Sequence, residues 1–124
     1  MTRRFVYDES ADPPAPVLPL LLAAPESEES VLVTALVDTG ADCTLVPADV
    51  VRRLRLPVVD RLLVEGLGGA TRRAPVHLAL VRVAGDRCLA RVVAFEREAI
   101  LGRDLLNRLT LSLDGPRLRG RFTH

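Results

Sequence analysis

Short apolar runs separated by turn residues constrain the fold of this chain more than any other feature. The runs at residues 17–24 and 31–37 flank an acidic turn at residues 25–30, as the two strands of a hairpin do. Apolar residues make up 48% of the chain and are mostly Leu, Val and Ala, whereas aromatic residues make up 3%. Because aliphatic and β-branched side chains pack well on pleated sheets, this composition favours strands.

The rest of the chain continues this pattern and adds two short helical segments. Further strands are expected at residues 44–46, 61–65, 74–83 and 88–95 and in a C-terminal hairpin at residues 111–120. A short helix is expected at residues 47–54 and a helix of two turns at residues 102–109. Many short strands with two short helices predict an all-β fold, a small closed or nearly closed barrel.

Composition excludes several functional classes. The 124 residues carry a net charge of +1, so neither a nucleic-acid partner nor an acidic tail is indicated. No segment approaches the roughly 20 apolar residues of a membrane helix. The run at residues 17–24 follows three acidic residues and contains Pro19, which argues against an export signal and favours a cytoplasmic location.

Cys43 and Cys88 are expected to be buried thiols, and His77 a core or face residue. With one internal histidine, neither a metal site nor a cofactor is expected.

The tripeptide Asp38-Thr39-Gly40 directly follows the apolar run at residues 31–37. Burying a carboxylate costs several kcal/mol unless it is paired or hydrogen-bonded. A following glycine allows a sharp turn and a close approach of other groups. A carboxylate in such a loop can have its pKa tuned for acid–base work. However, Asp and Gly are common in turns between strands, so the tripeptide alone favours a structural role.

Three segments in order resemble motifs of the retropepsins, the retroviral-type aspartic proteases. Residues 37–42 (Val-Asp-Thr-Gly-Ala-Asp) resemble the active-site motif, and residues 65–70 (Glu-Gly-Leu-Gly-Gly-Ala) resemble the glycine-rich tip of the flap hairpin. Residues 99–106 (Ala-Ile-Leu-Gly-Arg-Asp-Leu-Leu) resemble the late segment that runs behind the catalytic loop into a C-terminal helix. The resemblance covers residues 17–113. It implies a small closed barrel with a flap hairpin, and residues 114–124 extend the same domain. Residues 1–16 are charged and proline-rich and are expected to form an N-terminal arm or a loosely held strand.

The resemblance implies an aspartic endopeptidase that needs no cofactor. Two carboxylates a hydrogen bond apart share one proton, the known arrangement of aspartic proteases, so one activates water while the other polarises the peptide carbonyl. Because the chain has one such motif, the resemblance implies a homodimer with Asp38 of each copy as the catalytic pair. Thr39 and Gly40 would complete the active-site loop. The C-terminal extension could form a strand at the dimer interface or dock back on its own subunit.

The other site residues are also assigned by the resemblance. An extended peptide or protein substrate would contact Ala41, Asp42, Gly66, Leu67, Gly68 and Ile100. Gly102 and Arg103 would support the loop, with Asp42 and Arg103 forming a buried ion pair. The sequence departs from the retroviral pattern at Glu65, where a further glycine is common, and at both ends.

Other interpretations of the same residues stay open. A peptide-binding or dimerisation module could keep the barrel without turnover, since fold does not establish function. A monomeric barrel with a structural Asp38 is a third hypothesis. The glycines at residues 66–69 could in principle hold phosphate, but a phosphate loop favours a following helix and a Gly-Lys-Ser/Thr sequence, and the chain has no such sequence.

Overall fold

The computed structural model describes residues 2–65 and 67–123, which form ten strands and two short α-helices. The strands are β1 (Thr2–Asp8), β2 (Ala15–Ala23), β3 (Ser30–Val37), β4 (Thr44–Pro47), β5 (Val58–Glu65), β6 (Thr71–Val83), β7 (Asp86–Phe95), β8 (Ala99–Leu101), β9 (Thr110–Asp114) and β10 (Arg119–Thr123). The helices are α1 (Ala48–Leu54) and α2 (Arg103–Leu106), and short 3-10 turns lie at Leu67–Gly69 and Gly115–Arg117.

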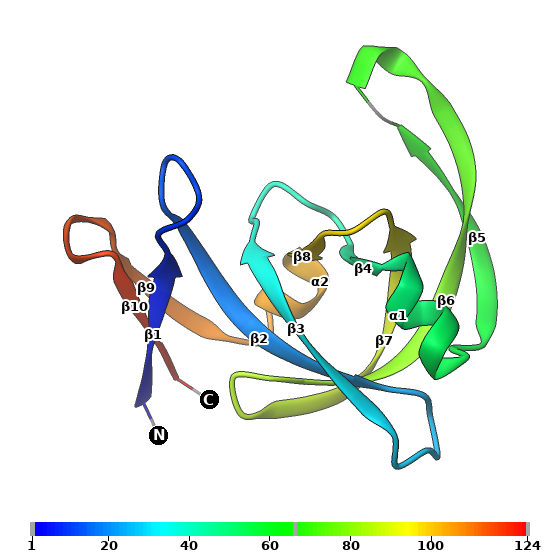
Figure 1. The fold of residues 1–124 in the computed structure, drawn as a ribbon, viewed down its shortest axis with the longest axis horizontal. Helices are drawn as coiled ribbons and strands as arrows, with labels where there is room; N and C mark the ends of the chain where they lie inside the picture. Colours follow the sequence, from blue (N-terminus) through cyan, green and yellow to red (C-terminus); the bar gives the residue numbers. More distant parts are fainter. Residues whose placement is uncertain (1, 66, 124) are drawn as a thin grey trace.

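The strands in the middle of the chain close into a barrel. The hydrogen-bonded order is β2-β3-β8-β4-β7-β6, and β6 pairs back with β2 to complete the ring. The β3–β8 and β4–β7 pairs are parallel, whereas the other pairs of the ring are antiparallel (Figure 1). This arrangement confirms the predicted small closed all-β barrel.

The barrel core is built from alternate side chains of its strands. Leu18, Leu20 and Leu22 of β2 point inward and are fully buried, whereas Pro19 between them is exposed. Period-two alternation of this kind follows from the pleat of a strand. Each buried aliphatic side chain of this size contributes about 1.5–3 kcal/mol relative to exposure. The same cluster includes Val46, Val81, Val92 and Leu101, which come from β4, β6, β7 and β8.

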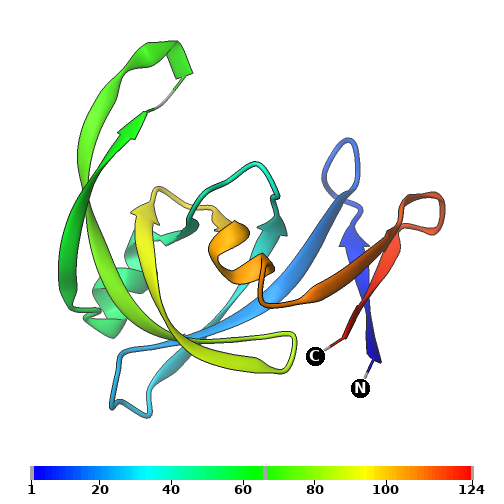
Figure 2. The ribbon, with the colours of Figure 1, turned by 180° about the vertical axis from the view of Figure 1, so that it is seen from behind.

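The β5–β6 hairpin rises from one end of the barrel (Figures 1 and 2). Its two strands pair from Val58↔His77 to Glu65↔Thr71, and most side chains of β5 are exposed. At its tip, Gly68 and Gly69 have φ values of 82° and 78°, a left-handed conformation that glycine adopts without steric cost. Gly66 and the side chain of Leu67 lie outside the described residues.

Both ends of the chain join one sheet on the same subunit, which we call the terminal sheet (β1, β10 and β9). β1 pairs with β10 from Thr2 to Val6, and β10 pairs with β9. The ring of Phe5 stacks on that of Phe122, with centroids 6.3 Å apart, and both are buried. The C-terminal extension therefore docks on its own chain, and residues 2–8 of the predicted arm form a fully paired strand.

Two expectations about the remaining elements are wrong. α2 has four residues rather than two full turns, because the N–H groups of Arg108 and Leu109 bond to carbonyls three residues earlier before the chain leaves for β9. Cys43 and Cys88 are free, as expected, but half-buried rather than buried. Partial desolvation raises the pKa of both thiols.

None of the helices in the described ranges combines the length and the apolar character needed to span a bilayer.

Candidate active site

Asp38 opens the loop between β3 and β4 at one end of the barrel. Its backbone N–H donates to the carbonyl of Leu101 on β8 over 3.1 Å. Its carboxylate Oδ1 accepts the N–H of Gly40 at 2.9 Å, and its carbonyl accepts the N–H of Ala41 at 3.2 Å. Asp38 is half-buried, and Thr39 and Gly40 are exposed. The loop therefore folds around the carboxylate and leaves it open to solvent on one side.

Arg103 clamps this loop from α2 by three separate contacts. One guanidinium nitrogen donates to the carbonyl of Thr39 at 2.8 Å, and the other donates to the carboxylate of Asp42. The backbone N–H of Arg103 also donates to the carbonyl of Ala41 at 2.9 Å. The predicted Asp42–Arg103 contact is present, but its predicted burial is wrong. In this single chain the Asp42 side chain is 87% exposed, because the loop projects beyond the barrel end.

Gly102 lets the segment before α2 lie directly against the loop. A Cβ at this position would lie 2.5 Å from the carbonyl oxygen of Cys43 and 3.1 Å from that of Ala41. Real Cβ atoms essentially never approach backbone so closely. The supporting role assigned to Gly102 therefore has a steric basis: only glycine allows β8 and α2 to pack behind residues 38–44.

Thr44 and Asp104 form a further anchor that the sequence analysis missed. Thr44 is fully buried, and its hydroxyl donates to Asp104 Oδ1 at 2.8 Å while it accepts the N–H of Gly102 at 3.1 Å. Asp104 also accepts the N–H of Thr44 at 3.2 Å and that of Leu105 at 3.0 Å. A Thr at the start of a short strand and an Asp in the first turn of a helix are both common, so neither residue signalled the contact.

The remaining predicted site residues are spread over the same end of the molecule. Ile100 is half-buried on β8 between Leu36 and Leu45, and Gly68 lies at the tip of the β5–β6 hairpin. The hairpin and the loop after β3 rise from the same end of the barrel in Figures 1 and 2. The structure thus brings together residues 38–44 and 102–104. The tip of the hairpin stands apart from the loop in Figures 1 and 2.

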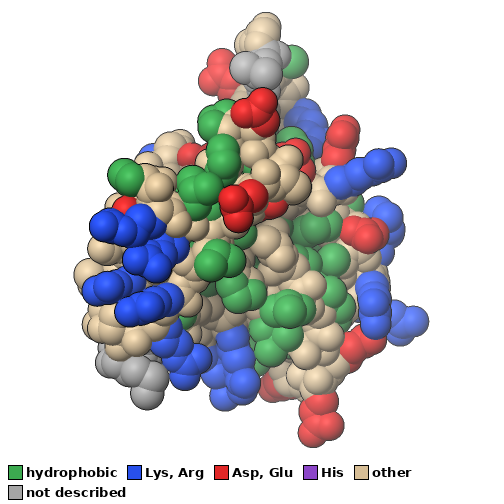
Figure 3. Space-filling view, turned by 60° about the vertical axis from the view of Figure 1, so that its left-hand side comes forward, with side chains coloured by type: hydrophobic (Ala, Val, Ile, Leu, Met, Phe, Trp, Pro, Cys, Tyr) green, Lys and Arg blue, Asp and Glu red, His purple; other side chains and the backbone are tan. Residues whose placement is uncertain are grey.

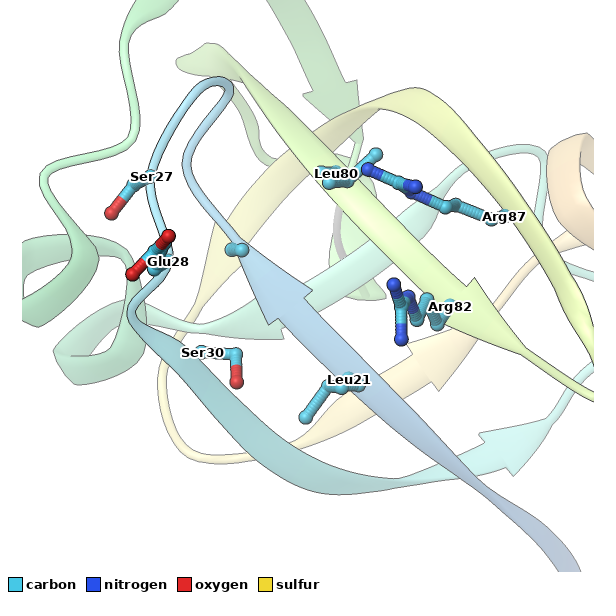
Figure 4. Close-up of a pocket in the computed structure, with 8 residues that line it drawn as sticks. Leu21, Ser27, Glu28, Ser30, Leu80, Arg82 and Arg87 are labelled. Carbon is cyan, nitrogen blue, oxygen red and sulfur yellow. The ribbon is translucent and has the colours of Figure 1, made fainter.

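A separate hollow of about 290 Å³ lies at the opposite end of β3 (Figure 4). It is lined by Leu21, Ala23, Ser27, Glu28, Ser30, Leu80, Arg82 and Arg87. Ser30 begins β3 whereas Asp38 follows its end, so this hollow is distinct from the candidate site.

A closed barrel with an Asp-Thr-Gly loop clamped by a Gly-Arg segment defines a retropepsin-like fold. Residues 29–108 match the family model described as gag-polyprotein putative aspartyl protease. The match covers most of the chain, and the chain belongs to this family. A comparison with curated proteins gave no match.

Solved structures show the same fold. The EIAV protease, solved with an inhibitor, is 22% identical with a TM-score of 0.57, over 76% of this chain and 86% of that one. A retropepsin-like aspartic protease from Rickettsia conorii is 14% identical with a TM-score of 0.58, over 98% of this chain and 91% of that one. These similarities confirm the fold predicted from the sequence.

Proposed function

We propose that this protein is an aspartic endopeptidase that acts as a homodimer, with Asp38 of each subunit as the catalytic pair. The observation that carries the proposal is the construction of the loop around Asp38. Arg103, Gly102 and the Thr44–Asp104 pair hold the loop from behind, and the N–H of Gly40 holds the Asp38 carboxylate within it. Stability alone does not need so many contacts on the loop around a half-buried carboxylate, whereas catalysis needs that carboxylate preorganised.

The need for a second copy follows from the chemistry. Each chain has one Asp-Thr-Gly sequence, and Asp42 is engaged by Arg103. A second carboxylate at hydrogen-bonding distance from Asp38 therefore has to come from another subunit. A twofold axis beside the loop supplies it, since an isologous contact places the same residue of both subunits together.

In the proposed reaction the two carboxylates hold one proton between them. The ionised carboxylate takes a proton from water as the water oxygen attacks the peptide carbonyl carbon. The protonated one donates to the carbonyl oxygen, which gives a neutral tetrahedral gem-diol. Collapse of the gem-diol breaks the C–N bond, while a proton passes to the leaving amine and the dyad returns to its starting state. An extended peptide would lie between the loop and the β5–β6 hairpin, which would close over it as a flap with Leu67 and Gly68 at its tip.

The test compares the wild type with Asp38→Asn on a library of extended peptides. The wild type is expected to cleave with an optimum at mildly acidic pH, because one dyad proton must be retained. The variant is expected to lose at least about three orders of magnitude in kcat. Sedimentation of both proteins across a concentration series measures dimer formation separately. A rate that rises steadily through alkaline pH contradicts the dyad.

The same experiment separates the other hypotheses. If the wild type and Asp38→Asn both bind peptides and leave them uncut, the protein is a peptide-binding module. If both proteins sediment as monomers at every concentration, the shared dyad is ruled out and Asp38 is structural.

A further inference from the structure

One face of the terminal sheet carries a cluster of arginines that the proposed protease function does not use. In the strand register Arg4 of β1 lies opposite Arg121 of β10, and Arg119 is two residues along β10 on the same face. Residues directly opposite each other in antiparallel strands share a face. We call Arg4, Arg119 and Arg121 the arginine face. All three are exposed, and Arg side chains gather on this side of the molecule in Figure 3.

The other side of the sheet is the core side. Phe5 and Phe122 alternate with the three arginines along β1 and β10, and both phenylalanines are buried. The arginines therefore point away from the core. Next to them the surface is hollowed by about 270 Å³, with Ser112, Asp114 and Gly120 as the other lining residues.

Two of the three arginines of this face, Arg4 and Arg121, form no ion pair with a carboxylate of the described residues, and Arg119 shares the charge of Asp114 with Arg117. Among residues 2–65 and 67–123, no carboxylate lies within ion-pair distance of Arg4, Arg119 or Arg121. Asp114 of β9 lies opposite Arg119 in the register but forms its ion pair with Arg117 at 3.0 Å. The hydrogen bond from Arg117, and more weakly the charge of Arg119, lower the pKa of Asp114. Like charges directly opposite each other on neighbouring strands destabilise a sheet. In a chain of net charge +1, this face therefore carries a local excess of positive charge, and Arg4 and Arg121 are available to an external partner.

We propose that the arginine face binds an extended, acidic segment of a partner protein. Guanidinium groups match carboxylates in a bidentate geometry. Residues two apart on a strand are about 6.6–6.8 Å apart, so Arg119 and Arg121 present the same repeat as alternate side chains of an extended peptide. A peptide with an acid at every second position can therefore contact both, with Arg4 beside Arg121 as a third cation.

Two other occupants fit this face less well. A second copy of the chain in a twofold contact would bring arginine against arginine, and like-charge contacts cost several kcal/mol. Single-stranded nucleic acid gains much of its affinity from bases stacked on aromatic rings. On this sheet both phenylalanines turn to the core side, so the arginine face offers no such platform.

The test measures binding of a fluorescein-labelled peptide of five Glu-Ser repeats by fluorescence anisotropy. Binding is independent of catalysis, so the full chain is used with Asp38→Asn present throughout to prevent cleavage. Arg4→Gln with Arg121→Gln is expected to weaken binding roughly tenfold or more, since a hydrogen bond to a charged group is worth about 1.5–3 kcal/mol. Binding should also fall steeply with salt, because screening shortens from about 10 Å at 0.1 M to about 3 Å at 1 M.

A matched control comes from the other opposed arginine pair, Arg82 and Arg87 on β6 and β7. Arg82→Gln with Arg87→Gln removes the same charge and is expected to leave affinity nearly unchanged. An equal loss of peptide affinity in both double variants would show that only net charge matters, and it would overturn the proposal. So would equal binding of a Gln-Ser peptide, or a labelled oligonucleotide that binds more tightly than the acidic peptide. Circular dichroism of each variant confirms that the barrel is intact.

Discussion

The loop after β3 and the β5–β6 hairpin are held in opposite ways, although both rise from the same end of the barrel. The loop is fixed by contacts from distant parts of the chain: Arg103 bonds to three loop residues, and the backbone at Gly102 touches it directly. The hairpin is held mainly by its own ladder, and most side chains of β5 face solvent. The loop is therefore held by several independent tertiary contacts, whereas the hairpin depends on its own strand pairing.

This difference matches what the proposed chemistry requires. A catalytic carboxylate has to stay within a few tenths of an ångström of its productive position, which needs redundant anchors. A segment that admits and covers a substrate has to open at low cost, and such segments have few buried contacts. The comparison also predicts that the same substitution has very different effects in the two regions.

The largest difference is expected between Gly102→Ala and Gly68→Ala. At Gly102 the new methyl group meets backbone at 2.5 Å, and backbone can yield only by shifting the loop. The expected loss is about 3 kcal/mol or more in the free energy of unfolding. At Gly68 nothing lies within 4 Å, so only the positive φ is penalised, by about 1–2 kcal/mol. Urea unfolding followed by circular dichroism measures both.

Gly115→Ala is the matched control for this pair. Gly115 has open space around its Cβ position and no positive φ, so the change is expected to stay within about 0.5 kcal/mol. If Gly102→Ala unfolds at the same urea concentration as this control, the close approach behind the loop is not a constraint. The contrast between the two regions would then be lost.

A smaller effect is expected from Thr44→Val. The substitution keeps the shape of a fully buried side chain but removes the hydroxyl that joins Asp104 to the N–H of Gly102. Leaving these groups without their partner is expected to cost about 1–3 kcal/mol in the free energy of unfolding. Thr34→Val, on the exposed face of β3, is the control and should change stability by less than about 0.5 kcal/mol. Equal values for the two variants would show that the hydroxyl contributes nothing.

The sequence predicted the features that depend on local pattern. The apolar runs at residues 17–24 and 31–37 and the acidic turn between them are visible in the order of residues, and they define the hairpin that starts the barrel. The Asp38 loop was identified by its motif, and the Asp42–Arg103 contact came from the family resemblance. Its exposure was not predictable from sequence, because it depends on how far the loop projects from the barrel.

The features that were missed depend on pairing between distant residues. Thr44 and Asp104 are 60 positions apart, and β1 joins β10 across nearly the whole chain. Neither pairing leaves a periodic signal in the sequence. α2 is shorter than its apolar pattern predicts because the chain has to turn into β9, so tertiary structure overrides local propensity.

The smallest effect is a pH dependence of stability from His77, at the base of the β5–β6 hairpin. His77 is buried, its Nδ1 has no hydrogen-bond partner within the described ranges, and burial together with the charge of Arg61 lowers its pKa. The unfolded chain, with an ordinary histidine pKa of about 6.5, therefore binds more protons than the folded chain below that pH. Stability from this residue is complete above about pH 6.5 and is lost as the pH falls from there through the lowered folded pKa.

One proton limits the slope to about 1.4 kcal/mol per pH unit. His77→Leu, which leaves no group to protonate, should flatten this part of the profile when urea unfolding is measured between pH 5 and pH 7.5. The lowered carboxyl pKa values of Asp8 and Asp114 do not interfere, because they act only below the ordinary value of about 3.9. If the free energy of unfolding of His77→Leu keeps the same slope against pH, the proton is taken up by a group other than His77. Protonation at the acidic pH expected to favour the dyad would then not destabilise the base of the hairpin. The Asp38 loop and the β5–β6 hairpin would differ in their packing but not in their response to pH.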